Sequence, residues 1–248
     1  MRIVCSLLAI AFSLTASAQT PATHPDGRSI LERSSAAMGC SLINPNTAIH
    51  VAAHLQASSL PAPMALTIDS QGNSRWRSEL DTPKEHKVTI VNNGKGQMRH
   101  ADGRVTPLAE NNTSHQRPMH IPCLTNIALP PGAVDATYVR TEAAGADSLD
   151  VVELLPVARP ALKTAADRMK TTAWISQTTG YLARLQYVNT AEQDSNDTQT
   201  VEIDYFDYRL IDGLAVPFHQ VTHSGKLTLD LQLDSVQLNA PTADFQLR

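Results

Sequence analysis

Aromatic side chains are scarce in this sequence, making up 4% of its 248 residues. Proteins that bind single-stranded nucleic acid or sugars stack their ligands on such rings, so this scarcity argues against a stacking platform. Basic residues are not in surplus either: the net charge is −4 and the pI is about 6.1. We therefore expect no nucleic-acid partner. With 42% hydrophobic and 18% charged residues, the chain can form one sizeable core.

The motifs of catalysis and phosphate binding are also missing. The sequence has no GxSxG, HExxH, CxxC or P-loop pattern. Gly94-Lys95-Gly96 is a fragment of a phosphate loop, but it lies between two strand patterns and does not open a helix, which indicates a turn. We expect a protein that is not an enzyme and needs no cofactor.

Long hydrophobic runs are absent after the first residues. Met1–Ala18 has Arg2 at its start, an apolar run over 3–14 and a small-residue cleavage pattern at Ala16-Ser17-Ala18, as in a signal peptide. The alternative, a membrane anchor, needs a longer run. Cys5 lies inside the run, where a lipid-modified cysteine is not expected. The sequence predicts a periplasmic or secreted protein that does not span a membrane and begins at Gln19, with a mobile leader over 19–28.

Two cysteines remain after removal of the signal peptide, Cys40 and Cys123. An even number in an exported protein favours a disulfide, and two cysteines allow one pairing. The alternative is two small buried side chains that never meet. Spacing alone does not place the Cα atoms within about 7 Å of each other, so both interpretations stay open.

Helical signals occur in two places. Arg28–Gly39 has Ser29 as a candidate N-cap, Glu32 three residues later and Gly39 as a candidate C-terminal glycine. Val157–Lys170 contains helix-forming residues after Pro160. One to three short helices are expected in all.

Strand signals dominate the remainder. Apolar and polar residues alternate along most of Thr200–Leu247, with turns at Asp212-Gly213 and Ser224-Gly225. Similar patterns begin near Ala48 and continue through short turns. Most of these strands have a single apolar face. The pattern predicts a mainly β (α+β) fold, in which a curved antiparallel sheet of about eleven strands forms an incomplete barrel covered by the helices.

The apolar faces supply a candidate binding surface. On Lys226–Asp234, four leucines point to one side of the strand. If each apolar face turns inward, the same concave surface carries the apolar residues of the earlier strands. The predicted lining consists of Leu66, Ile68, Trp76, Ile90, Leu227, Leu229, Leu231 and Leu233. These side chains must be covered by the helices, by a ligand, or by both.

Histidines are numerous, and two pairs are four residues apart, His50 with His54 and His219 with His223. On a helix this spacing chelates zinc, but both pairs lie in strand patterns, where four residues span about 13 Å. Neither pair can hold one ion by itself. A metal site assembled across several strands remains an alternative, and we predict none.

The segment from Gly72 to Leu108 resembles the bacterial LolA/LolB-like superfamily of outer-membrane lipoprotein carriers and sorting proteins. The matching features are an Arg-aromatic-Arg strand at 75–77 and a hydrophobic strand at 88–91 that runs into Gly94. The C-terminal part is also similar, through Asp207-Tyr208, Gly213, Pro217, Asn239, Pro241 and Phe245.

This resemblance implies an incomplete barrel of about eleven strands with a helical lid, whose apolar hollow accepts lipoprotein acyl chains. It also implies that Arg75 or Arg77 holds the lid. The expected organisation is one LolA-like half-barrel domain over 29–248. The first functional hypothesis is a protein that binds or carries a lipid or lipoprotein acyl chain. The second is an interaction or sensor module of the same fold that meets an envelope protein and takes no ligand.

Overall fold

The computed structural model describes residues 26–72, 74–82, 85–93, 95–108, 121–124, 134–156, 170–190, 198–241 and 244–246. The predicted signal peptide, the predicted cleavage point at Gln19 and nearly all of the predicted leader lie outside these residues, as does the helix expected over Val157–Lys170, apart from Lys170 itself.

A single antiparallel sheet dominates the described part of the chain. Its thirteen strands, two more than expected, are β1 (Ala48–Ala57), β2 (Met64–Gln71), β3 (Arg75–Asp81), β4 (His86–Asn92), β5 (Lys95–Arg99), β6 (Val105–Leu108), β7 (Val134–Ala144), β8 (Asp147–Pro156), β9 (Thr171–Ser176), β10 (Leu182–Thr190), β11 (Thr198–Ile211), β12 (Leu214–Ser224) and β13 (Leu227–Leu238).

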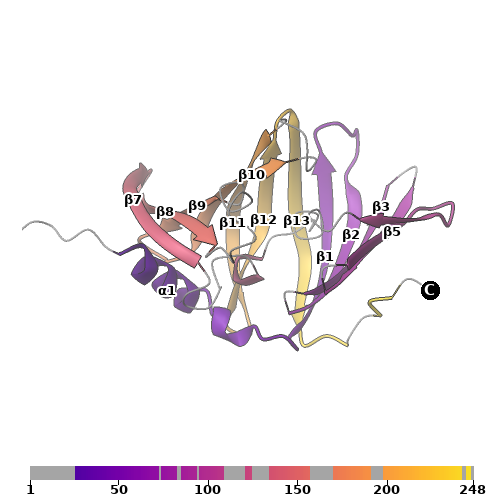
Figure 1. The fold of residues 1–248 in the computed structure, drawn as a ribbon, viewed down its shortest axis with the longest axis horizontal. Coiled ribbons are helices and arrows are strands. Elements are labelled where there is room, and N and C mark those ends of the chain that lie inside the picture. The colour runs from indigo at the N-terminus through magenta and orange to yellow at the C-terminus, as the bar shows by residue number, and fades with distance from the viewer. Residues whose placement is uncertain are drawn as a thin grey trace, which may run out of the picture.

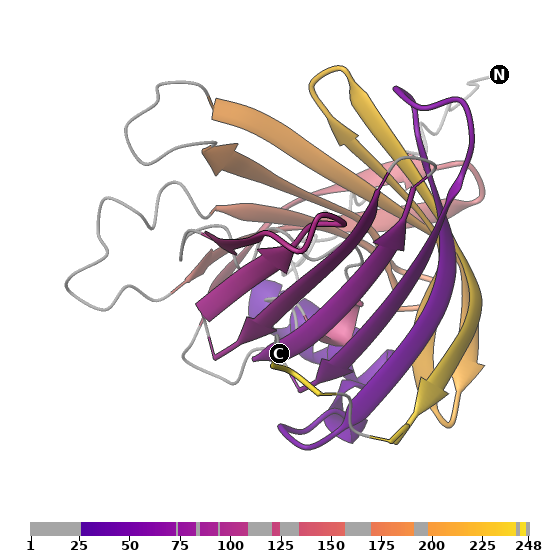
Figure 2. The ribbon, with the colours of Figure 1, turned by 90° about the vertical axis from the view of Figure 1, so that its right-hand side faces the viewer.

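The strand order is β6-β5-β4-β3-β2-β1-β13-β12-β11-β10-β9-β8-β7. Two meanders are therefore joined where the last strand lies beside the first, and β6 and β7 remain as edges in the described sheet. The sheet is strongly curved but not closed (Figures 1 and 2). The expected incomplete barrel is confirmed.

Local sequence explains these strands and turns. Along β1, Ile49, Val51 and Leu55 are buried, and residues between them are more exposed, as alternation requires. Asp212 and Gly213, which join β11 to β12, have φ angles of 50° and 88°. Two positive φ angles are typical of the two-residue hairpin turn that fits the twist of the flanking strands, and Asp-Gly favours it.

One α-helix, α1 (Gly27–Ala37), accompanies the sheet in the described residues, with the short 3-10 helices η1 (Cys40–Leu42) and η3 (Pro122–Leu124). The N-cap of α1 is Asp26, whose carboxylate accepts a hydrogen bond from the Ser29 amide. The prediction of Ser29 as the N-cap is therefore wrong. Gly39 follows the helix with a φ of 72°, which confirms its predicted left-handed conformation.

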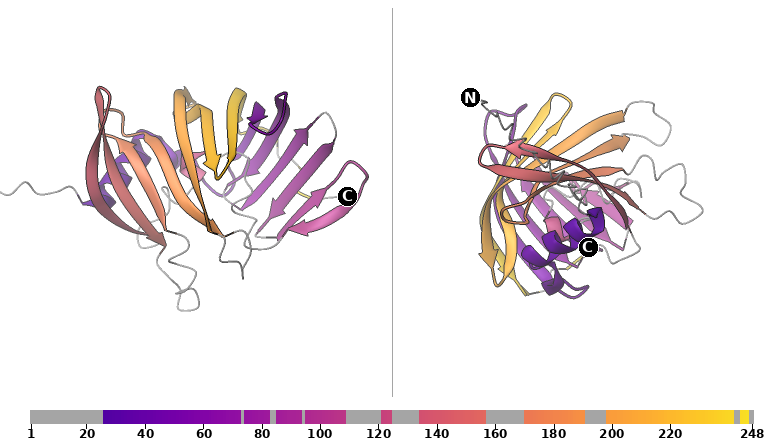
Figure 3. Two further views of the ribbon diagram at one scale, coloured as in Figure 1. Left: turned by 90° about the horizontal axis from the view of Figure 1, so that it is seen from above. Right: turned by 90° about the vertical axis from the view of Figure 1, so that its left-hand side faces the viewer.

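Helix α1 lies inside the curve of the sheet, beside β7 and β8 (Figure 3). A Cβ atom at Gly27 would come within 2.7 Å of the Ala136 carbonyl oxygen, so glycine lets the helix begin directly against the β7 backbone. Ile30, Leu31 and Met38 join the main hydrophobic core from this side. The helix therefore covers one end of the concave side of the sheet.

Candidate functional site

We call the face of the sheet that carries Val51 and Leu55 the inner face. The register between neighbouring strands shows which residues of the other strands lie on it. Directly paired residues of adjacent strands point to the same side. The inner face continues from β1 through β13, β12, β11, β10 and β9 to β8, where it includes Asp150 and Val152. Because Arg33 of α1 contacts Asp150, the helix packs on this same face.

One row of inner-face residues crosses five neighbouring strands, from β11 to β2. The register pairs its members in succession, and all of them are buried. The row consists of Tyr205, Gln220, Leu231, Leu55 and Met64. At about 4.8 Å per strand it spans roughly 19 Å. Its apolar part is bounded on the β12–β11 side by two polar side chains.

Most of the predicted lining residues share the inner face. Leu66, Ile68 and Trp76 lie there on β2 and β3 and are buried, as are Leu231 and Leu233 on β13. Leu229 is half-buried against the same core. Leu227 has the same orientation by alternation, but it is 38% exposed next to the β12–β13 turn. That these residues bind a ligand stays a prediction.

Ile90 is the exception, and its placement on the inner face is wrong. The register pairs Trp76 with Val91 and Arg77 with Ile90, so Ile90 points to the opposite, outer face. There Val88, Ile90 and Phe245 form a separate hydrophobic cluster. The C-terminal segment therefore covers Val88 and Ile90 on the outer face, whereas the strand pattern alone predicted that Ile90 lies on the inner face.

The two arginines expected to hold the lid, Arg75 and Arg77, also lie on the outer face, which does not fit a contact with α1. Alternation along β3 directs them away from the inner-facing Trp76. Arg75 donates to the Gln71 side chain, and Arg77 forms an ion pair with Glu79. Neither arginine can reach α1 from this side of the sheet.

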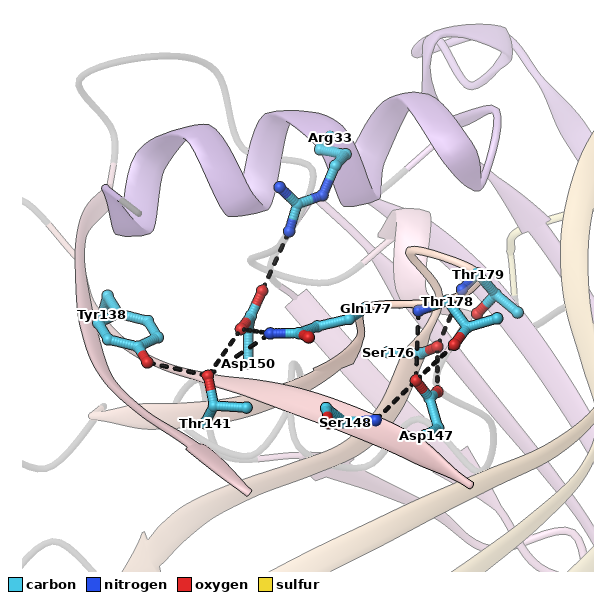
Figure 4. A network of polar contacts seen from close by, with 10 residues as sticks. All are labelled: Arg33, Tyr138, Thr141, Asp147, Ser148, Asp150, Ser176, Gln177, Thr178 and Thr179. Carbon is cyan, nitrogen blue, oxygen red and sulfur yellow. Dashed lines mark hydrogen bonds and ion pairs between the residues drawn. The ribbon is translucent and has the colours of Figure 1, made fainter. Parts of the chain in front are cut away.

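A different ion pair fastens α1 to the sheet. An Arg33 guanidinium nitrogen lies 3.0 Å from a carboxylate oxygen of Asp150 on β8, whose side chain is 2% exposed. The other Asp150 oxygen accepts hydrogen bonds from Gln177, at 2.6 Å, and Thr141, at 3.2 Å (Figure 4). The buried carboxylate thus accepts hydrogen bonds from three side chains, and Arg33 supplies the positive charge that pairs with it.

Arg33 has no recognisable signal in the sequence, since it and Asp150 are 117 residues apart. An arginine on a short helix usually faces water, and the pairing depends on how α1 is placed across β8. Only the folded arrangement brings the two groups together.

A second carboxylate, that of Asp147, links neighbouring turns of the sheet near α1. Asp147, at the start of β8, accepts hydrogen bonds from the Ser176 and Thr178 hydroxyls and from the amides of Ser148 and Thr178 (Figure 4). The Ser176 and Thr178 hydroxyls are the main cause that lowers the pKa of Asp147 to about 2, since they stabilise its charged form. The β7–β8 hairpin and the β9–β10 turn are therefore held together.

We expect Arg33→Gln to loosen α1 from the inner face, because it leaves the buried Asp150 carboxylate without its cation. Charged hydrogen bonds contribute about 1.5–3 kcal/mol, so amide exchange in α1 should accelerate about tenfold or more. Hydrogen exchange followed by mass spectrometry checks this. Arg28→Gln is the control, because among the described residues Arg28 pairs with Glu32 along the helix surface. Equal exchange in the two variants would show that Arg33 does not hold the helix.

The predicted disulfide is confirmed: Cys40 is bonded to Cys123, and both cysteines are buried. Cys40 begins η1, just after α1, and Cys123 lies in η3. The Met38 carbonyl also accepts a hydrogen bond from the Ala215 amide of β12. The C-terminal end of α1 is therefore tied covalently to η3 and by its backbone to the sheet.

The histidines of the two pairs considered for metal binding lie on the outer face. His50, His54 and His219 each contact one carboxylate, those of Asp69, Asp234 and Asp230. Within the described ranges, no group of three or more His, Cys, Asp or Glu side chains could hold a metal ion. No helix of this part of the chain is long and apolar enough to cross a membrane.

Comparison of the fold with solved structures gives consistent matches, although no protein-family model and no curated protein matches the sequence. A LolA superfamily protein from Nitrosomonas europaea has a TM-score of 0.57 at 13% identity, with 88% of this chain and 96% of that chain covered. A putative outer membrane lipoprotein-sorting protein domain from Vibrio parahaemolyticus has a TM-score of 0.59 at 9% identity, covering 88% and 94%.

A DUF1329 family protein from Desulfovibrio piger is similar over 90% of this chain and 98% of its own, with a TM-score of 0.58 and 10% identity. Identities this low carry the fold and not the activity. The open thirteen-stranded sheet, the helix inside its curve and these three structures agree with the resemblance seen in the sequence. The chain has the LolA-like fold.

Proposed function

We propose that this protein binds the acyl chain of a lipid or lipoprotein on its inner face and carries it through the cell envelope as a non-enzymatic periplasmic or secreted protein. The observation that supports this most is the buried row across β11, β12, β13, β1 and β2. Its apolar part is lined by Leu231, Leu55 and Met64, with Leu66 and Leu233 beside them. This continuous apolar part covers two strand spacings, about 10 Å, and fits part of an extended hydrocarbon chain.

Helix α1 is the proposed lid at one end of the inner face. It covers the inner face near β7 and β8, held by the Arg33–Asp150 ion pair and by the Cys40–Cys123 disulfide. Entry of an acyl chain requires movement of protein groups, because the lining residues are already buried. The acyl chain of the ligand then takes the place of the displaced protein groups, and each methylene that it buries contributes about 0.8 kcal/mol.

The second candidate function is an interaction or sensor module for an envelope protein. The burial of the lining favours it: Leu66 and Leu231 are only 2% and 3% exposed. An inner face filled by the protein's own side chains is a core, in which case the partner meets another surface.

Native mass spectrometry of the protein purified from the periplasm of a Gram-negative host distinguishes the two functions. A carrier should show additional masses that correspond to bound lipid, removed by extraction with organic solvent. Only the mass of the unliganded chain, in preparations that remain folded, would contradict the carrier function and favour the interaction module.

A further inference from the structure

Four of the five tyrosines of the protein gather on two neighbouring strands and the turn before them, at Tyr181, Tyr187, Tyr205 and Tyr208. The rings of Tyr181 and Tyr208 have centroids 4.8 Å apart. Tyr187 and Tyr205 lie on the inner face of β10 and β11 by register. In a chain with so few aromatic residues, this tyrosine cluster is a distinct local feature.

The strand geometry explains how Tyr205 and Tyr208 reach the same cluster. Three residues apart on a regular strand, they would point to opposite faces. Asp207 between them has a φ of 49°, which interrupts the alternation of β11. Both rings consequently pack against the main core.

The hydroxyl groups of Tyr205 and Tyr208 differ in one respect. Tyr208 donates a hydrogen bond to the Leu182 carbonyl oxygen at 2.7 Å. Tyr205 is 4% exposed, and its hydroxyl is buried without a hydrogen-bond partner among the described residues. An unpaired buried hydroxyl costs about 1–3 kcal/mol, and an acceptor atom brought by a ligand would recover this cost.

The described side chains that flank this hydroxyl in the row and the cluster are uncharged. The side chains that flank Tyr205 in the row and the cluster are Gln220, Tyr187 and Tyr208, and none of them is ionised at neutral pH. Burial, together with Tyr208 and Tyr187, raises the pKa of Tyr205, so the group stays a neutral donor. A neutral carbonyl oxygen fits this environment, whereas a carboxylate would lack a cation.

We propose that Tyr205 forms a polar subsite that donates a hydrogen bond to the ester or amide carbonyl of an acylated ligand, whose hydrocarbon chain runs along the row toward Leu231, Leu55 and Met64. This inference rests on the proposed function, because it concerns the polar end of the same ligand. It assigns a class, neutral acyl esters or amides, and an orientation, with the carbonyl at β11 and the chain toward β2.

The test compares Tyr205→Phe with the wild type, using methyl palmitate, palmitamide, free palmitate and hexadecane as competitors of a fluorescent fatty-acid probe. Tyr205→Phe should lose about tenfold in affinity for the ester and the amide and keep its affinity for hexadecane. Equal losses for all four, or no loss, would overturn the subsite. Comparison of methyl palmitate with palmitamide shows which acyl linkage the subsite prefers. In the wild type, both compounds should bind more tightly than palmitate.

Stability gives an independent readout. Since Tyr205→Phe removes an unpaired group, the unliganded variant should melt at the same temperature as the wild type or about 2–4 °C higher. Tyr208→Phe is the matched control: it leaves the Leu182 carbonyl without its donor, so it should melt lower and keep the preference for the ester. A lower melting temperature for Tyr205→Phe would show that its hydroxyl is already satisfied, which overturns the inference. If the wild type binds none of the four compounds, the proposed function itself fails.

Discussion

Leu231→Glu should lower the free energy of unfolding by at least about 3 kcal/mol and abolish binding of a fatty-acid probe. Leu231 is 3% exposed in the middle of the inner-face row, between Gln220 and Leu55. The change removes an apolar side chain from the core and introduces a carboxylate for which the row supplies no cation. Urea denaturation measures the stability, and fluorescence titration of the folded fraction measures the binding.

Gln232→Glu is the control for this variant. Gln232 is the next residue on β13 and is exposed on the outer face, where the register places it opposite His54 and His219. The same new charge should change stability by less than about 0.5 kcal/mol there and leave binding intact. Similar behaviour of the two variants would mean that β13 does not separate an apolar inner face from a solvated outer face.

Removal of the Cys40–Cys123 disulfide should destabilise the protein by about 4 kcal/mol. The bond joins residues 83 apart in the chain, and closing a loop of this length restricts the unfolded state strongly. The double variant Cys40→Ala, Cys123→Ala should therefore unfold at a lower urea concentration than the oxidised wild type. Loss of the bond also frees η3 from the end of α1.

Reduction of the wild type provides the control for the two substitutions. The reduced wild type should unfold close to the double variant, and the variant should not respond to the reductant. If the reductant leaves the wild-type transition unchanged while the thiols become free, the disulfide contributes nothing to stability.

The strands and hairpins could be predicted from the sequence because alternation and turn residues are local signals. Ile49, Val51 and Leu55 repeat every second residue, and Asp212-Gly213 specifies its own turn. The face of β4 could not be predicted in the same way. Its residues 88–91 are all buried, so no alternation of buried and exposed residues shows which side chains face inward. The segment containing Phe245 covers the outer side.

The contacts of the candidate site depend on tertiary structure. Alternation along β3 already directs Arg75 and Arg77 away from the side that Trp76 faces, and the resemblance to known carriers concealed this conflict. The ion pair of Arg33 with Asp150 joins a helix to a distant strand, and no local pattern marks it. Tyr205 is likewise unremarkable in sequence, because its unpaired hydroxyl is a property of the folded core.

The two tryptophans allow a direct test of the central claim, that an acyl chain binds on the inner face. Trp76 lies on the inner face of β3. Trp174 of β9 lies on the outer face, where its indole nitrogen donates to Glu142. A brominated fatty acid quenches the fluorescence of a tryptophan that it contacts.

The measurement is a quenching titration of two single-tryptophan variants, Trp174→Phe, which retains Trp76, and Trp76→Phe, which retains Trp174. We expect saturable quenching of Trp76 and none of Trp174, with the non-brominated fatty acid reversing the effect by competition. Quenching of Trp174 alone, equal quenching of both, or no quenching of either would contradict binding on the inner face.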